Sequence, residues 1–324
     1  MRKIWITWEK HRRTEELACA LPEVDLFEFN LDTNRLVRYP YLLFKTILTL
    51  LRERPDLVIV QNPSIVLSFF MVTFRKLIKF HVVVDSHNEG IMPFYSRYNW
   101  LLPIYALIQK WAILTIVTNE ELAKVVGKNG GRPFVLADKI PQLNNSKYIK
   151  LKGKWNAVFI CSFAKDEPFI EVIQAAHLID PSICIYVTGR YQNASKDIIS
   201  NAPSNVIFTG YIPNQTYINL LNSCDIVIDL TLMQDCLVCG AYEAVALGKP
   251  MILSDTKSLR DYFYKGTIFT ENKKEAIANS INTATEHLSS LAQQIYILRG
   301  NIQNEWETNF FKLCLILEQL NNMN

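Results

Sequence analysis

Short apolar runs and longer amphipathic stretches alternate along the whole chain. Apolar runs rich in Val, Ile and Phe are typical of buried strands, and the stretches between them predict helices. In the first half, strands are predicted at residues 3–7, 25–29, 57–60, 81–85, 114–117 and 134–137, with helices at 14–21 and 39–52. This alternation is typical of a doubly wound parallel sheet.

The pattern lapses over residues 139–154, which are rich in Pro, Gln, Asn, Ser, Lys and Gly and predict a linker. It then resumes, with strands predicted at 157–162, 183–188, 205–210, 225–230, 250–254 and 267–270, helices at 168–179 and 214–223, and helix from 275 to the end. We therefore expect two Rossmann-like α/β domains that face a cleft, at 1–145 and 155–300. A last helix at 301–324 is expected to return to the first domain.

Composition agrees with a globular chain of two domains. Of the 324 residues, 49% are hydrophobic and 20% are charged, which excludes an intrinsically disordered chain. No signal peptide and no apolar segment long enough to span a membrane is visible, so a cytoplasmic location is expected. The seven cysteines lack the spacing of a disulfide framework, and the pair Cys236 and Cys239 has no second pair to complete a zinc site.

The two halves differ in charge. Residues 1–150 hold 21 Lys and Arg against 14 Asp and Glu, a balance of +7, whereas the remainder has 13 against 17, a balance of −4. A basic half predicts an anionic partner: a phosphate-bearing acceptor, an acidic membrane surface or nucleic acid. No nucleic-acid-binding motif is present, so nucleic acid is the least favoured partner.

The stretch 235–255 (DCLVCGAYEAVALGKPMILSD) carries the most specific chemistry. It follows the predicted strand 225–230, so its helix is expected to point its N-terminus at the carboxyl edge of a parallel sheet. Free N–H groups and the helix dipole favour phosphate there. Glu243, deeper in the helix, suits the hydroxyl pair of a ribose. Together these features predict a site for a sugar nucleotide.

This stretch resembles the donor-site signature of retaining glycosyltransferases with the GT-B fold, of the group 1 or family 4-like type. The family signature has Glu, seven residues, a second Glu, a helix that ends in Ala-x-Gly-x-Pro, and a strand that ends in Ser. In this chain the corresponding positions are Asp235, Glu243, Ala246, Gly248, Pro250 and Ser254. The resemblance covers nearly the whole second half and extends loosely over the first.

The resemblance implies roles for the residues of this stretch. Glu243 would bind the ribose, and Asp235, a shortened acid, would face the transferred sugar as a catalytic residue. Main-chain N–H groups would meet donor oxygens; they belong to Leu237, Val238, Cys239 and Gly240. The alternative is a solvated Glu243 with an ordinary helix stop at residues 248–250.

The resemblance departs from the family at the first strand and helix of the second half. Family members carry Gly-Arg there, followed by a Lys, and grip the donor diphosphate with this cationic pair. Here the positions are Cys161-Ser162 and Glu167 or Pro168. Ser162 remains a donor-site residue, and Lys165 supplies one charge or is a solvated loop lysine.

Two strand ends in the second half resemble family positions that line the nucleotide base. They are Gly189 with Arg190 and Gly210 with Tyr211, and the alternative for each is a plain turn. Arg190 is also a candidate to replace the missing diphosphate grip.

In the first half, a run of cations follows the first strand: Lys10, His11, Arg12 and Arg13. Guanidinium groups bind phosphate in pairs, so this run is expected on the phosphate or acceptor side, the alternative being a solvated basic turn. The resemblance implies that His87, at the end of another strand, faces the transferred sugar as a catalytic residue, with Asp85 to orient it. A structural role is the alternative for His87.

We therefore expect sugar transfer from a nucleotide sugar, UDP-linked, to a hydroxyl of a glycan or lipid-linked acceptor, with retention of anomeric configuration. No metal or other cofactor is expected, and catalysis would rest on positioning and on stabilising the departing diphosphate. The alternatives are a noncatalytic partner with the same fold and a sugar-nucleotide epimerase. The charge of +7 and the aromatic, cationic stretches 39–54 and 69–80 predict peripheral association with the inner face of the cell membrane. Buried helices that cover the sheet are the alternative for each stretch.

Overall fold

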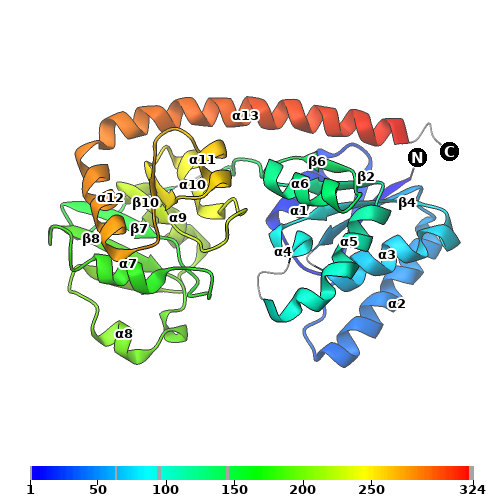
Figure 1. Ribbon diagram of the computed structural model, residues 1–324, viewed down its shortest axis with the longest axis horizontal. Coiled ribbons are helices and arrows are strands. Elements are labelled where there is room, and N and C mark those ends of the chain that lie inside the picture. The colour runs from blue at the N-terminus through cyan, green and yellow to red at the C-terminus, as the bar shows by residue number, and fades with distance from the viewer. Residues whose placement is uncertain (1, 63, 93–95, 144–145, 321–324) are drawn as a thin grey trace. The chain divides into compact units, whose positions relative to one another are not determined.

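The computed structural model describes residues 2–62, 64–92, 96–143 and 146–320. The chain forms two compact units (Figure 1): unit 1 is Met1–Lys139 with Glu305–Asn324, and unit 2 is Ile140–Asn304. Within the described residues, each unit contains one six-stranded sheet whose neighbouring strands are all parallel. The predicted pair of doubly wound α/β domains is confirmed.

The sheet of unit 1 has the strand order β2-β1-β3-β4-β5-β6. Its strands are β1 Lys3–Thr7, β2 Val24–Glu28, β3 Leu57–Asn62, β4 His81–Ser86, β5 Leu114–Val117 and β6 Pro133–Val135. β1, β3 and β5 are buried along their whole length. Helices therefore cover both faces, which explains why these strands are continuous apolar runs in the sequence.

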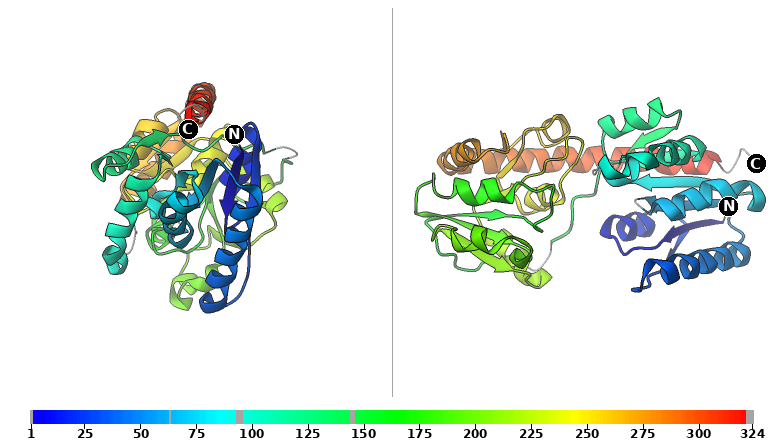
Figure 2. Two further views of the ribbon diagram at one scale, coloured as in Figure 1. Left: turned by 90° about the vertical axis from the view of Figure 1, so that its right-hand side faces the viewer. Right: turned by 60° about the horizontal axis from the view of Figure 1, so that its bottom comes forward.

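The helices of unit 1 lie on both sides of this sheet (Figure 2). They are α1 Arg12–Ala20, α2 Arg35–Glu53, α3 Ile65–Ile78, α4 Asn88–Ile91, η1 Ser96–Leu101, α5 Leu102–Trp111 and α6 Glu120–Lys128. One face packs Ile4 and Val58 against α2, α3 and α5. The other packs Trp5 and Ile59 against α1 and the end of the last helix, as the alternation of side chains along a strand requires.

The sheet of unit 2 has the strand order β12-β11-β10-β7-β8-β9. Its strands are β7 Trp155–Phe159, β8 Ile183–Thr188, β9 Val206–Gly210, β10 Ile226–Asp229, β11 Met251–Ser254 and β12 Thr267–Thr270. Its other helices are α7 Phe169–Ala175, η2 Tyr191–Asn193, α8 Lys196–Ser200, α9 Asn214–Ser223, α10 Cys239–Leu247, α11 Lys257–Tyr262 and α12 Lys274–Glu286.

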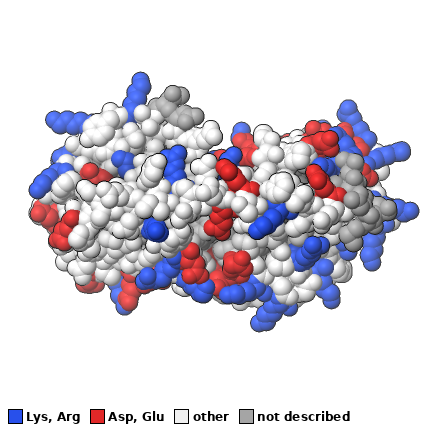
Figure 3. All heavy atoms as spheres, turned by 90° about the horizontal axis from the view of Figure 1, so that it is seen from above, with Lys and Arg blue, Asp and Glu red and all other residues white. Residues whose placement is uncertain are grey.

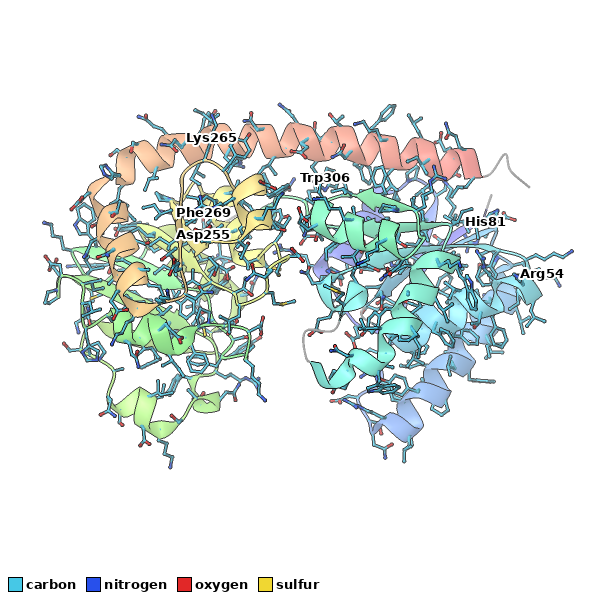
Figure 4. The ribbon with its side chains drawn as sticks, in the orientation of Figure 1. Arg54, His81, Asp255, Lys265, Phe269 and Trp306 are labelled. Atoms are coloured by element: carbon cyan, nitrogen blue, oxygen red, sulfur yellow. The ribbon has the colours of Figure 1, made fainter. Side chains whose placement is uncertain are left out.

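The predicted helix after residue 275 is two helices in the structure. α12 ends at Glu286, and α13 runs over Leu288–Gln319. Its last residues belong to unit 1, where Trp306 faces the sheet (Figure 4). The indole Nε1 of Trp306 donates to the carbonyl oxygen of Ala137 at 3.2 Å, and the ammonium of Lys139 lies 5.0 Å from the ring centroid.

The stretch predicted as a linker is largely part of unit 2. The main-chain N–H of Lys147 donates to Asn219 Oδ1, that of Ile149 to Ser223 Oγ, and that of Lys152 to the Tyr186 hydroxyl, each at 2.8 Å. The side chains of α9 and β8 thus satisfy a backbone that has no regular structure of its own, which a local pattern cannot reveal.

Candidate functional site

A pocket of about 450 Å³ opens at the carboxyl edge of the unit 2 sheet. Five of the predicted donor-site residues line it: Ser162, Gly189, Arg190, Gly210 and Tyr211. They follow β7, β8 and β9, three neighbouring parallel strands whose carboxyl ends meet at one edge. The topology therefore brings together residues that are far apart in sequence.

A tight turn at Gly189 shapes the middle of the pocket. Its φ is +86°, and a Cβ at this position would lie 2.1 Å from the carbonyl oxygen of Cys161. Only glycine fits where the turn after β8 passes so close to the loop after β7. The strand-ending glycine of the sequence is thus a requirement of this wall of the pocket.

Arg190 and Tyr211 form one side of the pocket. The guanidinium carbon of Arg190 lies 5.3 Å from the centroid of the Tyr211 ring, and this ring is 76% exposed. The contact is a cation–π pair, which holds the cation and an open aromatic face side by side. Such a pair suits a flat ring that carries an anionic group nearby.

Glu243 reaches this pocket through Tyr217. The Tyr217 hydroxyl donates to Glu243 Oε2 at 2.5 Å, and Tyr217 itself lines the pocket. Burial and the neighbouring Glu243 both raise the pKa of Tyr217 above its ordinary value, so the phenol remains a donor. Glu243 is half-buried on α10, which makes its solvated alternative the weaker description.

The start of α10 carries a buried carboxylate beneath it. The main-chain N–H of Gly240 donates to Asp229 Oδ2 at 2.8 Å. A Cβ at Gly240 would lie 2.5 Å from this oxygen and 2.3 Å from Ile160 Cδ1, so the close approach requires glycine. Of the four N–H groups predicted to meet donor oxygens, that of Gly240 is therefore engaged inside the protein.

Burial raises the pKa of Asp229 well above its ordinary value. The Gly240 N–H opposes this shift, and the carboxylates of Glu243, Glu167 and Asp166 add to it. The neutral form of Asp229 is favoured where several acids gather below one edge of the sheet.

The other predicted donor-site residues are not among those that line the pocket. Asp235 is half-buried in the segment between β10 and α10, and Lys165 is exposed in the loop after β7. Leu237 and Val238 are buried, whereas Cys239 is exposed at the first position of α10. Their contacts with a donor stay predictions.

In unit 1, Arg13 lies at the carboxyl edge of the sheet but is buried among carboxylates. Its Nε and Nη2 donate to both oxygens of Asp85 at 3.0–3.2 Å, Nη1 donates to Asp138 Oδ1 at 2.6 Å, and Nη2 also donates to the carbonyl of Leu136. Burial opposes the charge, but Asp85 and Asp138 outweigh it and raise the pKa of Arg13. The guanidinium is thus committed to the protein, which disagrees with the expected phosphate contact.

Asp85 therefore has a different partner from the one expected. It is completely buried, and its two oxygens accept from Arg13. Within the described residues no hydrogen bond joins Asp85 to the His87 ring, and the expectation that Asp85 orients His87 stays a prediction. A buried carboxylate needs a cation, and the nearest one is on α1.

The ring of His87 packs at a tilt against the ring of His11, which belongs to the basic run of the sequence. Their ring centroids are 4.4 Å apart with an interplanar angle of 59°. Burial lowers the pKa of His87 to about 4, although Asp85 opposes this shift. Both His87 Nε2 and His11 Nδ1 are buried, and among the described residues neither has a hydrogen-bond partner, so a neutral His87 imidazole with an unsatisfied ring nitrogen lies at this edge.

Lys10 and Arg12 remain at the surface of unit 1. The side chain of Lys10 is 72% exposed and pairs with Glu15 at 3.2 Å, and that of Arg12 is 43% exposed with Glu16 at 3.6 Å. These two cations retain the predicted access to a phosphate. In the described part of the chain, no group of three or more His, Cys, Asp or Glu side chains is arranged to hold a metal ion.

The sequence did not identify three residues of the unit 2 site: Tyr217, Asp229 and Glu167. Tyr217 follows Gly210 along the pocket wall and gives no motif of its own. Asp229 ends a buried apolar strand, and an acid at that position was the available signal. The side chain of Glu167 accepts hydrogen bonds from the loop after β7. In the family that the sequence resembles, a cation occupies the position of Glu167.

Residues 141–296 match the model of the family described as glycosyl transferases group 1. This match spans nearly all of unit 2. A comparison with curated proteins finds no match.

Solved structures match over the whole chain. Anabaena HepE in complex with UDP and glucose is 15% identical with a TM-score of 0.76, covering 98% of this chain and 100% of that one. Sucrose-phosphate synthase from Thermosynechococcus elongatus is 13% identical with a TM-score of 0.82, and both chains are fully covered. An E. coli structure titled trehalose-6-phosphate, bound with UDP-2-fluoro glucose, is 11% identical with a TM-score of 0.73 and 98% coverage of each chain. These similarities show a GT-B-like fold.

Proposed function

We propose that this chain, in which residues 141–296 form a glycosyl transferases group 1 domain, transfers a sugar from a UDP-sugar to a hydroxyl of a glycan or lipid-linked acceptor. The observation that carries the proposal is the pocket of about 450 Å³ at the carboxyl edge of β7, β8 and β9. Glu243 reaches its wall through Tyr217. A pocket at this edge is where an α/β sheet binds nucleotides.

Each wall of the pocket suits one part of a nucleoside diphosphate. The open face of Tyr211 beside Arg190 suits the base. Glu243 is a charged acceptor for ribose hydroxyls, and the Tyr217 hydroxyl is already donating to it. The choice of UDP rests on the structures of Anabaena HepE, one in complex with UDP and one with UDP-glucose.

Transfer would proceed with retention of anomeric configuration and without a metal or cofactor. Asp235 would face the transferred sugar, and His87 would face it with a neutral ring whose buried Nε2 has no hydrogen-bond partner among the described residues. The rate would come from positioning and from stabilisation of the leaving diphosphate. We place this activity in polysaccharide or glycolipid assembly.

A panel of UDP-, GDP-, ADP- and dTDP-sugars tests the donor, with thermal shift for binding and release of the nucleoside diphosphate for turnover. We expect binding and turnover with a UDP-sugar, and the α-linked sugar retained in the product by nuclear magnetic resonance of the anomeric proton. Binding of none of the donors would contradict the proposal. Inversion of a sugar hydroxyl without transfer would indicate an epimerase.

The acids near the pocket favour a second candidate, a noncatalytic partner with the same fold. Asp229 takes the Gly240 N–H, and Glu167 stands where the family has a cation. The charge of Glu167 opposes a diphosphate, and Asp229 occupies a main-chain N–H group at the start of α10. UDP binding without measurable turnover on any sugar would support this candidate.

We also propose that α2 of unit 1 rests on the cytoplasmic face of an anionic membrane. Of its six exposed large apolar side chains, five follow intervals of 4, 3, 4 and 3 residues, which place them on one helical face. They are Val37, Tyr41, Phe44, Leu48 and Leu51, and the sixth, Leu36, lies outside this series. The opposite face packs Leu42 and Leu50 into the core, so the outer stripe is a second apolar surface and needs a partner.

Cations outnumber acids along α2 and select the partner. Between residues 35 and 54 five of them stand against one acid, Glu53: Arg35, Arg38, Lys45, Arg52 and Arg54. Arg54 lies at the periphery of the unit (Figure 4). The end of α3 adds Arg75, Lys76 and Lys79 around the exposed Leu77. Lys and Arg side chains project from the surface of both units in Figure 3, which views the molecule from above. Apolar anchors within a cationic rim fit an anionic lipid surface.

Vesicles of phosphatidylcholine with and without phosphatidylglycerol test this surface. We expect sedimentation only with the anionic vesicles, weakened by salt and by Phe44→Ser. Neutralising Arg75, Lys76 and Lys79 would cost about 1 kcal/mol of binding free energy per cation. Phe311→Ser is the matched control, because Phe311 is also exposed in unit 1 but lies on α13. Equal binding to both vesicle types would contradict the proposal. No helix in the described residues is long and apolar enough to cross a membrane.

A further inference from the structure

The loop between β7 and α7 folds around the carboxylate of Glu167. The main-chain N–H of Ser162 donates to both carboxylate oxygens at 2.9–3.1 Å, and that of Ala164 donates to Oε2 at 2.9 Å. The Ser162 hydroxyl adds a bond at 2.9 Å, and the Cys161 thiol donates at 3.3 Å. Backbone and side-chain donors of one short loop thus converge on a single anion.

The backbone of this loop is bent to make that convergence possible. Phe163 has a φ of +62°, in the left-handed region that a residue with a side chain rarely adopts. Its ring is 8% exposed and packs against Phe169 at a centroid distance of 5.2 Å. The core therefore holds the loop in a conformation that presents N–H groups to one side, which is how backbone builds an anion-binding concavity.

The concavity that the Glu167 carboxylate occupies borders the pocket of unit 2. Cys161 and Ser162 donate to Glu167 and also line the pocket, next to the Gly189 turn. An anionic group of any ligand in the pocket therefore meets the loop whose donors Glu167 already uses. The influence of Glu167 extends further, since it adds to the rise in the pKa of the buried Asp229.

We propose that Glu167 is an internal counter-anion that competes with a ligand's phosphate groups for the N–H groups of Ser162 and Ala164. This inference rests on the proposed function, because it assigns the phosphate end of the same pocket. Glu167 lowers the affinity for phosphorylated ligands in two ways. It occupies the donors that a phosphate oxygen would use, and its charge repels the phosphate that approaches.

The proposal predicts a gain of affinity when the charge is removed. Glu167→Gln keeps the length of the side chain and one acceptor oxygen for the loop, but it carries no charge. We expect UDP to bind at least about tenfold more tightly, which corresponds to about 1.4 kcal/mol. Uridine has no phosphate, so its affinity should not change. Glu171→Gln is the matched control, because Glu171 is a carboxylate in the first turn of the adjoining helix α7.

Isothermal titration of UDP and uridine into the wild type, Glu167→Gln and Glu171→Gln decides the matter. Tighter UDP binding by Glu167→Gln alone supports the proposal. Unchanged or weaker UDP binding by a folded Glu167→Gln overturns it while the proposed function stands. If only Glu167→Gln binds UDP, the counter-anion is supported and the active transferase is refuted. If no form binds UDP, both proposals fail.

A measurement on the wild type covers the case in which Glu167→Gln does not fold. The side-chain carboxyl carbon of Glu167, observed by nuclear magnetic resonance, should shift when UDP displaces it from the loop, and uridine should not shift it. Saturation with UDP without any change at this carbon would overturn the proposal.

Discussion

The predicted site residues lie in different surroundings at the carboxyl edges of the two sheets. In unit 2, residues from three separate strand ends line one pocket. In unit 1, neighbours along one short run separate: Arg13 is buried in an ion-pair network, whereas Lys10 and Arg12 are exposed. The alternation of strands and helices thus predicts where the sheet edge lies. Whether a charged side chain at that edge is buried or exposed depends on partners elsewhere in the chain.

Breaking the network of Arg13 should have the largest effect. Arg13→Met removes the cation but leaves Asp85 completely buried, so we expect the free energy of unfolding to fall by about 3–5 kcal/mol. Arg12→Met, at an exposed neighbour, should change it by no more than about 0.5 kcal/mol. Urea denaturation measures both. Equal effects of the two substitutions would contradict the difference between the buried Arg13 and the exposed Arg12.

The second effect concerns the pH dependence of unit 1. Burial lowers the pKa of His87 from 6.5 to about 4. Between these values the unfolded chain binds a proton that the folded chain rejects, so the free energy of unfolding falls as the pH falls, by roughly 3 kcal/mol in all.

His87→Asn removes this titration, and denaturation curves from pH 7 to about pH 4 should then show a shallower loss. Four charged or titratable groups surround the ring and are common to both proteins: Asp85, Arg13, His11 and Asp138. Parallel curves for wild type and variant would show that His87 titrates normally.

In unit 2, a substitution at the edge should weaken a ligand rather than the fold. If Glu243 binds the ribose, Glu243→Ala should weaken UDP binding by about 1.5–3 kcal/mol for each lost charged hydrogen bond. Tyr217→Phe removes only the hydroxyl that donates to Glu243, so it should cost less. Calorimetry gives both affinities. Equal UDP affinity for wild type and Glu243→Ala would leave Glu243 with a structural role alone.

The fold was predictable because it rests on local periodicity. Strands such as Ile226–Asp229 and Met251–Ser254 lie inside the apolar runs that predicted them. The break at His287 gave no signal in the pattern. The packing of residues 147–152 on unit 2 was not visible either, since it depends on contacts distant in sequence. Helix boundaries also moved, as α7 ends at Ala175 instead of residue 179.

The site was predictable only in part, for a similar reason. Gly189 and Gly210 end strands and were recognisable as pocket positions. The bonds from Arg13 to Asp85 and Asp138 span 72 and 125 positions, so no local pattern could reveal that they bury its charge. Glu167 holds the opposite charge from the family cation, and only the folded loop shows which donors it takes.

Hydrogen–deuterium exchange with and without UDP tests most directly whether the edge of unit 2 is the nucleotide site. We expect UDP to slow exchange at residues 160–164, 188–193 and 210–217, which border the pocket, and at 237–243 at the start of α10. Exchange at residues 10–13 and 85–88 of unit 1 should not change with UDP alone. Protection confined to those unit 1 segments, with none around the pocket, would contradict the account.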